Sequence, residues 1–236
     1  MPKEPGAATE SPHGDRFRVR KFTDEAADVI RQQILGREIQ PGDRLNEVAL
    51  ARELQISRAP IREALNALAG EGLVQFVPGR GAFVPELSVA KVDNLGEVRQ
   101  ALECLGARLA VERATEAQLG DLERLIERTE TCLRDEPESY PSDLDFHLQL
   151  LTASGNPELV QTATAVISQL RLARVWSGKA PGRAVQACNE HRSIHRALLD
   201  RDGDAAEAAM RRHLEAAATS ARELLARTDG DAPAMT

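Results

Sequence analysis

The sequence has few aromatic residues and no long apolar run. Phe, Trp and Tyr together make up 3% of the 236 residues, whereas Ala, Leu, Glu and Arg are abundant. Residues of these four types favour helices, so we expect helix bundles rather than sheets. No segment approaches the roughly 18 consecutive apolar residues that indicate a transmembrane helix, and the N-terminal residues lack the apolar run of a signal segment. We therefore expect a cytoplasmic protein that does not contact a membrane.

Cysteine is also scarce. The three cysteines, Cys104, Cys132 and Cys188, are odd in number and none forms a CxxC pair. This spacing argues against a zinc ribbon and against a disulfide framework. We expect three buried free thiols.

The chain has little excess positive charge anywhere, and its net charge is −7. Residues 15–88 hold 11 Lys/Arg and 11 Asp/Glu, whereas residues 89–236 hold 18 and 24. The acidity therefore belongs to the C-terminal part. A DNA-binding N-terminal part needs only to place its Lys and Arg side chains on one face.

The N-terminal region predicts a leader followed by a helix-turn-helix. Residues 1–15 are polar, contain Pro and Gly, lack periodicity, and are expected to be disordered. Residues 16–21, RFRVRK, form a basic arm that either solubilises the chain or contacts DNA phosphates. Helices are expected at 24–35, after Asn46, and after Ser57. Pro60 lies in the first turn of the third helix, where its missing N–H costs nothing.

The third helix has the pattern of a DNA-reading helix. Apolar residues recur at Ile61, Leu65 and Leu68, which predicts the buried face. The opposite face presents two arginines near the N-terminal end, where guanidinium groups can bond guanine edges or clamp phosphates. The candidate DNA-binding residues of this helix are Ser57, Arg58, Ala59, Arg62 and Asn66.

A glycine-rich turn follows this helix and predicts a hairpin. Apolar stretches at 73–77 and 82–84 flank Pro78, Gly79, Arg80 and Gly81. Glycines beside the arginine let the protein backbone approach the sugar–phosphate backbone of DNA, and Arg80 could enter the minor groove. Gly79, Arg80 and Gly81 are therefore further DNA-binding candidates.

These segments resemble a known family. PGDRLNEVALARELQISRAPIREAL and LVQFVPGRGAFV, within residues 23–85, are similar to the N-terminal domain of the GntR family of bacterial transcription regulators. The resemblance implies a winged helix-turn-helix that binds double-stranded operator DNA. Ala59 departs from the pattern, because relatives often carry Thr there, so we expect one hydroxyl contact to the DNA backbone to be absent.

The chain beyond the linker at 86–88 predicts only helices. Apolar periodicity and capping residues place them at 89–114, 115–134, 142–153, 156–176, 184–201 and 205–226. The fold class is therefore mainly α, with a winged helix-turn-helix at 16–85, an all-helical bundle at 89–228 and a disordered tail at 229–236.

Four of the five histidines lie in the predicted helices of this bundle. Asp143 and His147 are four residues apart, as are His191 and His195, so each pair shares a helix face. His213 falls on the apolar stripe of the last helix. An imidazole that points into a bundle must be hydrogen-bonded or coordinate a metal. Spacing alone leaves both possibilities open. A single buried histidine usually bonds a carbonyl, whereas a set of nitrogen and oxygen donors of this kind suits Zn²⁺, Ni²⁺, Mn²⁺ or Fe²⁺.

A second resemblance bears on this choice. DLDFH, SGNPEL, EHRSIHRALLDRD and AAMRRHL stand in the order found in the FCD effector domain of the FadR subgroup of GntR regulators. Many such domains bind a divalent metal through one Asp and three His, which here correspond to Asp143, His147, His191 and His213. The resemblance thus implies a metal cofactor, zinc first, with Ni, Mn or Fe as alternatives.

Two further residues are ligand-binding candidates. Arg99 occupies a place from which such domains often reach a ligand carboxylate, although a surface ion pair with Glu103 at i+4 accounts for it equally well. His195, one turn beyond His191, is assigned to the pocket wall or to the surface.

The sequence therefore predicts a homodimeric transcription regulator, a repressor, that binds a palindromic operator and responds to a small organic acid at a metal site. Two alternatives stay open. One is a DNA binder whose metal only stabilises the bundle, and the other is a metalloenzyme that uses the Asp/His site to activate water. The effector, the operator and the direction of the response are not readable from the sequence.

Overall fold

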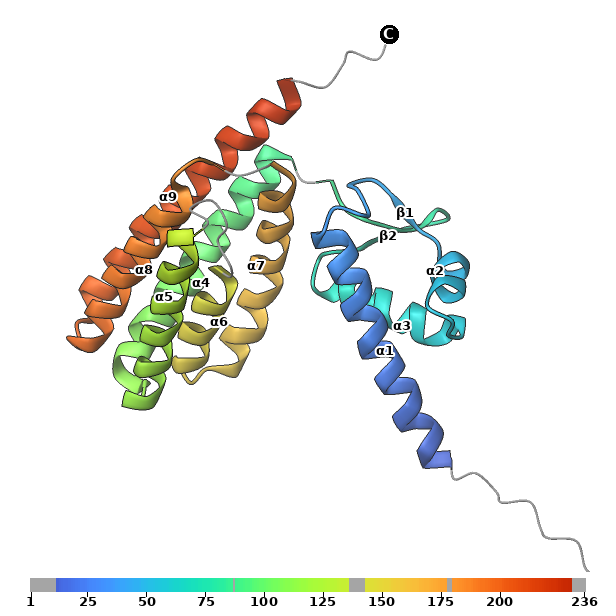
Figure 1. The fold of residues 1–236 in the computed structure, drawn as a ribbon, viewed down its shortest axis with the longest axis horizontal. Coiled ribbons are helices and arrows are strands. Elements are labelled where there is room, and N and C mark those ends of the chain that lie inside the picture. The colour runs from blue at the N-terminus through green and yellow to red at the C-terminus, as the bar shows by residue number, and fades with distance from the viewer. Residues whose placement is uncertain (1–11, 87, 136–142, 178–179, 231–236) are drawn as a thin grey trace, which may run out of the picture. The chain divides into compact units, whose positions relative to one another are not determined.

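The structure of the chain, a computed structural model, describes residues 12–86, 88–135, 143–177 and 180–230, and within these ranges all side chains except those of 12–20, 143–145, 174–177 and 227–230. It divides into two compact units, Met1–Pro85 and Glu86–Thr236 (Figure 1). The elements of the first unit are α1 Pro12–Leu35, β1 Arg44–Leu45, α2 Glu47–Glu53, α3 Arg58–Gly70, β2 Gln75–Val77 and β3 Gly81–Phe83. Those of the second are α4 Val89–Arg113, α5 Glu116–Asp135, α6 Asp143–Ala153, α7 Pro157–Ser177, α8 Arg183–Leu199 and α9 Gly203–Gly230.

The first unit is a winged helix-turn-helix. Helix α3 packs on α1 and α2 through its apolar face, and Ile61, Leu65 and Leu68 are fully buried with Ile30 and Ile34 of α1. Asn46 caps α2, because its Oδ1 accepts from the backbone N of Val48 at 2.9 Å and of Ala49 at 3.2 Å. Burying these side chains holds α3 in place and leaves its other face to solvent.

The sheet beside these helices has the strand order β1-β3-β2, all antiparallel. The hairpin of β2 and β3 agrees with the sequence, whereas β1 was not expected. It consists of only Arg44 and Leu45, which pair with Phe83 and Ala82. A strand this short has no readable alternation, so only its pairing with β3 reveals it.

The N-terminal end of α1 corrects one expectation. The helix begins at Pro12, so residues 12–15 are helical rather than part of a disordered leader, and the basic stretch 16–21 continues the same helix. Proline is favoured in the first turn, and nothing after Gly14 interrupts the helical run. Residues 1–11 lie outside the described ranges.

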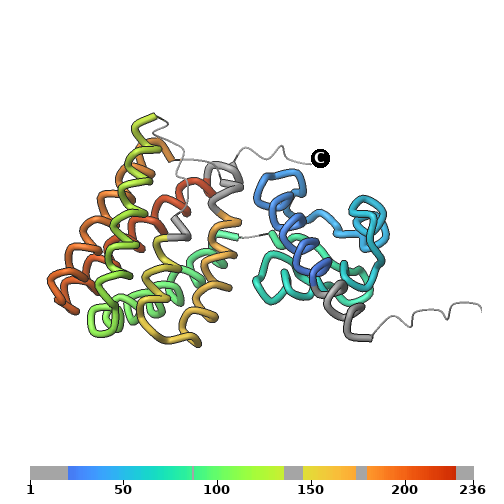
Figure 2. The backbone as a smooth tube through the Cα atoms, turned by 60° about the horizontal axis from the view of Figure 1, so that its bottom comes forward, coloured from blue at the N-terminus to red at the C-terminus, as the bar shows by residue number. Residues whose placement is uncertain are grey.

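The second unit is an all-helical bundle, as expected (Figures 1 and 2). Helix α4 packs against α9, α7 and α6, while α8 packs against α9 and α5. Gly106 of α4 lies against α6, since a Cβ there would approach Leu151 Cδ2 to 2.7 Å. The missing side chain lets α4 and α6 come close, and this contact brings Glu103 of α4 next to His147 of α6. No helix among the described residues combines the length and apolar character needed to cross a membrane.

Candidate nucleic-acid interface and metal centre

The exposed face of α3 carries the predicted DNA-reading residues. Arg58, Ala59, Arg62 and Asn66 are all exposed, and so is Glu63, whereas the other residues between them are buried: Pro60, Ile61, Ala64 and Leu65. Ser57 occupies the N-cap position with extended backbone, but its side chain makes no capping hydrogen bond. The expectation that this hydroxyl caps α3 is therefore wrong in detail, and the amide groups of the first turn keep the partial positive charge that favours an anion.

Glu47, at the start of α2, holds both arginines. Its Oε2 lies 3.0 Å from Arg62 Nη2 and 3.5 Å from Arg58 Nη2, and its Oε1 accepts from Arg62 Nε at 3.3 Å. The hydrogen bond from Arg62 and the charges of both guanidinium groups lower the pKa of Glu47, so this carboxylate is ionised at neutral pH. The Asn46 cap places Glu47 in the first turn of α2, directly opposite the arginines.

The turn between β2 and β3 has the conformation that the glycines predicted. Gly79 has φ 74° and Gly81 has φ 101°, a region that residues with a side chain rarely adopt. The backbone N of Arg80 donates to Val77 O at 3.0 Å and closes the turn. The Arg80 guanidinium lies 5.2 Å from the centroid of the Phe83 ring, which supports the exposed arginine at the tip.

Three histidines from three helices meet inside the second unit. His147 of α6, His191 of α8 and His213 of α9 are all buried, and one ring nitrogen from each lies within 4.8 Å of one from each of the others. Phe146 stacks on His191 with ring centroids 4.0 Å apart. The structure thus brings together three of the four predicted metal ligands. The fourth, Asp143, is the first residue of α6, and its side chain lies outside the described residues.

The rings of His147 and His213 face each other through one nitrogen and contact carboxylates through the other. Their Nε2 atoms are 3.2 Å apart. His147 Nδ1 lies 2.5 Å from Glu103 Oε2, and His213 Nδ1 lies 2.7 Å from Glu190 Oε2. If each Nδ1 donates its proton to a carboxylate, the two Nε2 atoms face each other with their lone pairs. Two lone pairs repel, so this arrangement needs a proton or a metal ion between the two nitrogens.

This arrangement fits a divalent metal. Two imidazole nitrogens bound tetrahedrally to one zinc ion at about 2.0–2.1 Å stand roughly 3.3 Å apart, close to the separation of the two Nε2 atoms. A carboxylate on the far nitrogen is the usual partner of a metal-bound histidine. The donor set of His147, His191 and His213 would suit Zn²⁺ first, with Ni²⁺, Mn²⁺ and Fe²⁺ as alternatives.

Arg99 takes a position that neither sequence interpretation described fully. Its Nε donates to Glu103 Oε1 at 2.5 Å, as the i+4 spacing suggested, but the pair is buried rather than on the surface. Burial opposes ionisation of Glu103, yet the charges of Arg99 and His147 outweigh it and lower the pKa of this carboxyl to about 2. Glu103 is therefore a buried carboxylate held between a cation and a histidine.

His195 has a different environment from the other three histidines. It is 3% exposed, and its Nε2 lies 2.9 Å from the carbonyl oxygen of Leu119 on α5. The surface half of the expectation for His195 is therefore wrong, because its side chain is buried at the contact between α5 and α8. One turn of helix separates it from His191, enough to aim the two rings at different neighbours.

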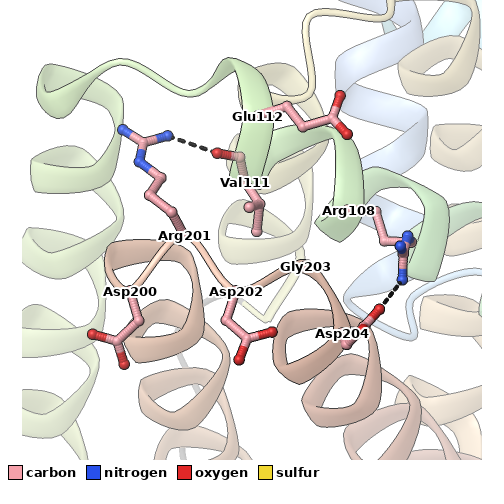
Figure 3. A pocket seen from close by; sticks show the side chains of 8 residues that line it. All are labelled: Arg108, Val111, Glu112, Asp200, Arg201, Asp202, Gly203 and Asp204. Carbon is pink, nitrogen blue, oxygen red and sulfur yellow. Dashed lines mark hydrogen bonds and ion pairs between the residues drawn. The ribbon is translucent and has the colours of Figure 1, made fainter.

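A separate pocket of about 490 Å³ lies where the turn between α8 and α9 meets α4 (Figure 3). Arg201 donates to Val111 O at 2.9 Å, and Arg108 pairs with Asp204 at 2.7 Å. Both contacts tie this turn to α4. The pocket contains none of the predicted site residues, and its contacts serve the packing of the bundle.

The thiols differ from one another. Cys104 and Cys188 are buried as expected, whereas Cys132 is exposed, which corrects the expectation for that residue. Burial raises the pKa of both Cys104 and Cys188 to about 11. Cys132 lies near the C-terminal end of α5 among polar neighbours, so its exposure was readable from the amphipathic pattern of that helix.

The sequence interpretation missed three carboxylates: Glu47, Glu103 and Glu190. Glu103 carried a signal in its i+4 spacing from Arg99, and Glu190 stands directly before His191 in the motif EHRSIHRALLDRD. Glu47 carried none, because its partners Arg58 and Arg62 are 11 and 15 residues away on another helix.

The chain matches known families over most of its length. Residues 22–84 match the family described as "Bacterial regulatory proteins, gntR family", and residues 94–216 match the FCD domain. The sequence is 33% identical over 202 residues to the HTH-type transcriptional repressor RspR of Escherichia coli. The aligned region covers 83% of this chain and 87% of RspR. It is 30% identical over 226 residues to the HTH-type transcriptional repressor NanR of Klebsiella aerogenes, and this aligned region covers 87% of both proteins.

A solved structure supports the fold. E. coli McbR/YncC superposes with a TM-score of 0.72 at 21% identity, over 88% of this chain and 98% of that one. With the winged helix-turn-helix, the helical bundle and these matches together, the chain belongs to the GntR family of bacterial regulatory proteins and is a transcription regulator with a C-terminal FCD domain.

Proposed function

We propose that this regulator is a repressor that binds a palindromic operator as a homodimer and releases it when a small organic acid binds at a metal site in the FCD domain. Two of its relatives, RspR and NanR, are named as repressors. A homodimer follows from the DNA geometry, because one recognition helix reads only a half-site and two-fold symmetry pairs it with a palindrome.

In this proposal α3 enters the major groove. Arg58 and Arg62 bond base edges or phosphates there, and Asn66 lies one turn further along the same exposed face. Ser57 and the first amide groups of α3 contact a phosphate. Ala59 contributes apolar contact only. Gly79 and Gly81 bring the hairpin backbone against the DNA, and Arg80 reaches the minor groove.

The metal is held by Asp143, His147, His191 and His213. The single observation that carries this part is the convergence of three buried imidazoles, in which the Nε2 atoms of His147 and His213 are 3.2 Å apart and a carboxylate lies behind each of these two rings. Asp143 precedes His147 by one helical turn and so shares its helix face. Three or four protein ligands leave coordination positions through which an effector carboxylate can bind.

Arg99 is the proposed second contact of the effector. An effector carboxylate would bind the guanidinium group of Arg99, whose Nε donates to Glu103. Arg99 and Glu103 lie on α4, the first helix after the linker, so a change at the metal can alter that helix. Such a switch operates only if the effector binds one of the two conformations more tightly.

A DNA-binding titration tests the proposal. An operator is first selected from random duplex DNA with the purified full chain, and its affinity is then measured with and without metal and a panel of mono-, di- and tricarboxylates. At least one acid should weaken operator binding by about 5- to 150-fold in the metal-loaded protein and have no effect on the metal-free protein. If every acid leaves the affinity unchanged while chelation lowers the melting temperature, the metal only stabilises the bundle. Hydrolytic or oxidative turnover by the metal-loaded chain would favour the enzyme alternative instead.

A further inference from the structure

A buried row of charged side chains reaches His147 from α4. Arg99 Nε donates to Glu103 Oε1 at 2.5 Å, and Glu103 Oε2 lies 2.5 Å from His147 Nδ1. The side chains of Arg99, Glu103 and His147 are 6%, 0% and 0% exposed. Water therefore does not screen these contacts, and the arginine that neutralises Glu103 also fixes its position.

A second row reaches His213 from α8. Glu190 Oε2 accepts from Arg183 Nη2 at 2.9 Å and lies 2.7 Å from His213 Nδ1. Arg183 Nη2 also donates to the backbone carbonyl of His213 at 3.4 Å. The guanidinium group thus holds the carboxylate and the backbone of the histidine at once. This row is partly exposed, at 17% for Arg183 and 21% for Glu190.

The two rows have the same order and end at the same point. Each runs arginine, glutamate, histidine, and each carboxylate occupies Nδ1, so that the Nε2 atoms of His147 and His213 meet at 3.2 Å. A ring whose Nδ1 is held by a carboxylate presents Nε2 as the metal donor and gains basicity. Four helices contribute to this arrangement, since the residues come from α4, α6, α8 and α9.

We propose that Glu103 and Glu190 are positioning residues for the metal ligands and that Arg99 and Arg183 anchor them. This inference rests on the proposed metal site and extends it to four residues outside the Asp/His set. It gives Arg99 a structural task that does not depend on an effector. It also links the metal to α4 through Glu103 and to α8 through Glu190.

Glu190 is the better residue for a test. Removing the charge of Glu103 would take a buried counterion from Arg99, which endangers folding. Glu190→Gln keeps the size of a partly exposed side chain. Glu130 supplies a matched control, because it pairs with Arg192 of the same helix α8 at 2.6 Å and the two are 33% and 40% exposed. Glu130→Gln removes a comparable ion pair whose carboxylate is bonded to an arginine and not to a histidine ring.

The affinity of the full-length chain for Zn²⁺ alone is measured by competition with a chromophoric chelator. Glu190→Gln should bind zinc about 10- to 100-fold more weakly than the wild type while keeping its stoichiometry, and Glu130→Gln should match the wild type. In the zinc-loaded chain the Nδ1–H proton of His213 should resonate far downfield, and Glu190→Gln should move it upfield. Arg183→Gln is a second variant, and it should weaken zinc binding less than Glu190→Gln.

The outcomes separate the two proposals. A wild type that binds zinc together with a Glu190→Gln variant of unchanged affinity, or an equal loss in Glu130→Gln, would overturn the positioning role and leave the metal site standing. A wild type that takes up no divalent metal would overturn both. If Glu190→Gln does not fold, Arg183→Gln provides the test. A zinc affinity and a His213 resonance equal to those of the wild type in Arg183→Gln would then overturn the positioning role.

Discussion

Glu47 Oε2 lies 3.0 Å from Arg62 Nη2, across the turn between the two helices of the DNA-binding unit. The same oxygen reaches Arg58 Nη2 at 3.5 Å. A single carboxylate therefore orients both arginines of the exposed α3 face before any DNA is present. Since the unit carries no net positive charge, affinity depends on how these few arginines are placed.

The two arginines should both be needed for operator binding. We expect Arg58→Ala and Arg62→Ala each to weaken operator binding by roughly 5- to 100-fold at fixed salt, if the side chains read bases. Fluorescence anisotropy with a labelled operator measures this. Arg124→Ala is a suitable control, because Arg124 is 66% exposed on the second unit. Near-unchanged affinity in both α3 variants would reject the placement of the recognition helix.

Glu47 should set selectivity more than strength. Replacing it by Gln removes a negative charge beside the DNA, so affinity for non-operator duplex should rise. The loss of arginine orientation should lower the ratio of operator to non-operator affinity by roughly two- to fivefold, the range of an exposed ion pair. Parallel titrations with operator and scrambled duplex give this ratio. A ratio equal to that of the wild type would mean that Glu47 only packs α2 against α3.

His191 should be indispensable for the metal but not for the DNA-binding unit. We expect His191→Ala to lose the metal and the effector response, because it removes one of the three converging imidazoles. Elemental analysis of the dialysed protein measures the metal content. The DNA-binding unit has its own core and should still bind the operator. Retention of one metal per chain would contradict the proposed ligand set.

His195 should behave in the opposite way. His195→Ala leaves the Leu119 carbonyl without this partner and opens a small cavity, which should cost about 1–3 kcal/mol of unfolding free energy. Its metal content should equal that of the wild type. Denaturant unfolding and elemental analysis of the same sample test both statements, and a metal-free His195→Ala protein would restore this histidine to the site.

Only one thiol should react with the native protein. Burial raises the pKa of Cys104 and Cys188 to about 11, so little thiolate forms at neutral pH. Cys132 is exposed and should account for a single fast equivalent of a disulfide reagent. Cys132→Ser should abolish this phase, and denaturant should expose the two remaining thiols. Two or more fast equivalents in the native wild type would mean that the bundle opens easily.

The DNA-binding unit and the helical addresses of the histidines could be predicted from local patterns. Asn46 and Ser57 mark helix starts, the glycines around Arg80 require a turn, and the apolar spacing in α3 separates its buried face from its exposed one. Each of these signals spans only a few residues. Local patterns therefore sufficed for the helices, the hairpin and the DNA-reading face, whereas the family and the metal-ligand set came from the resemblance of longer segments, and β1 was missed.

The tertiary structure alone decided which partners those residues have. Glu103 meets His147 across 44 positions of sequence, and Glu190 meets His213 across 23. His191 and His195 look alike as i, i+4 neighbours, yet one joins the histidine cluster and the other bonds a carbonyl of α5. A helical period tells which side chains share a face, but the packing of other helices determines what that face meets.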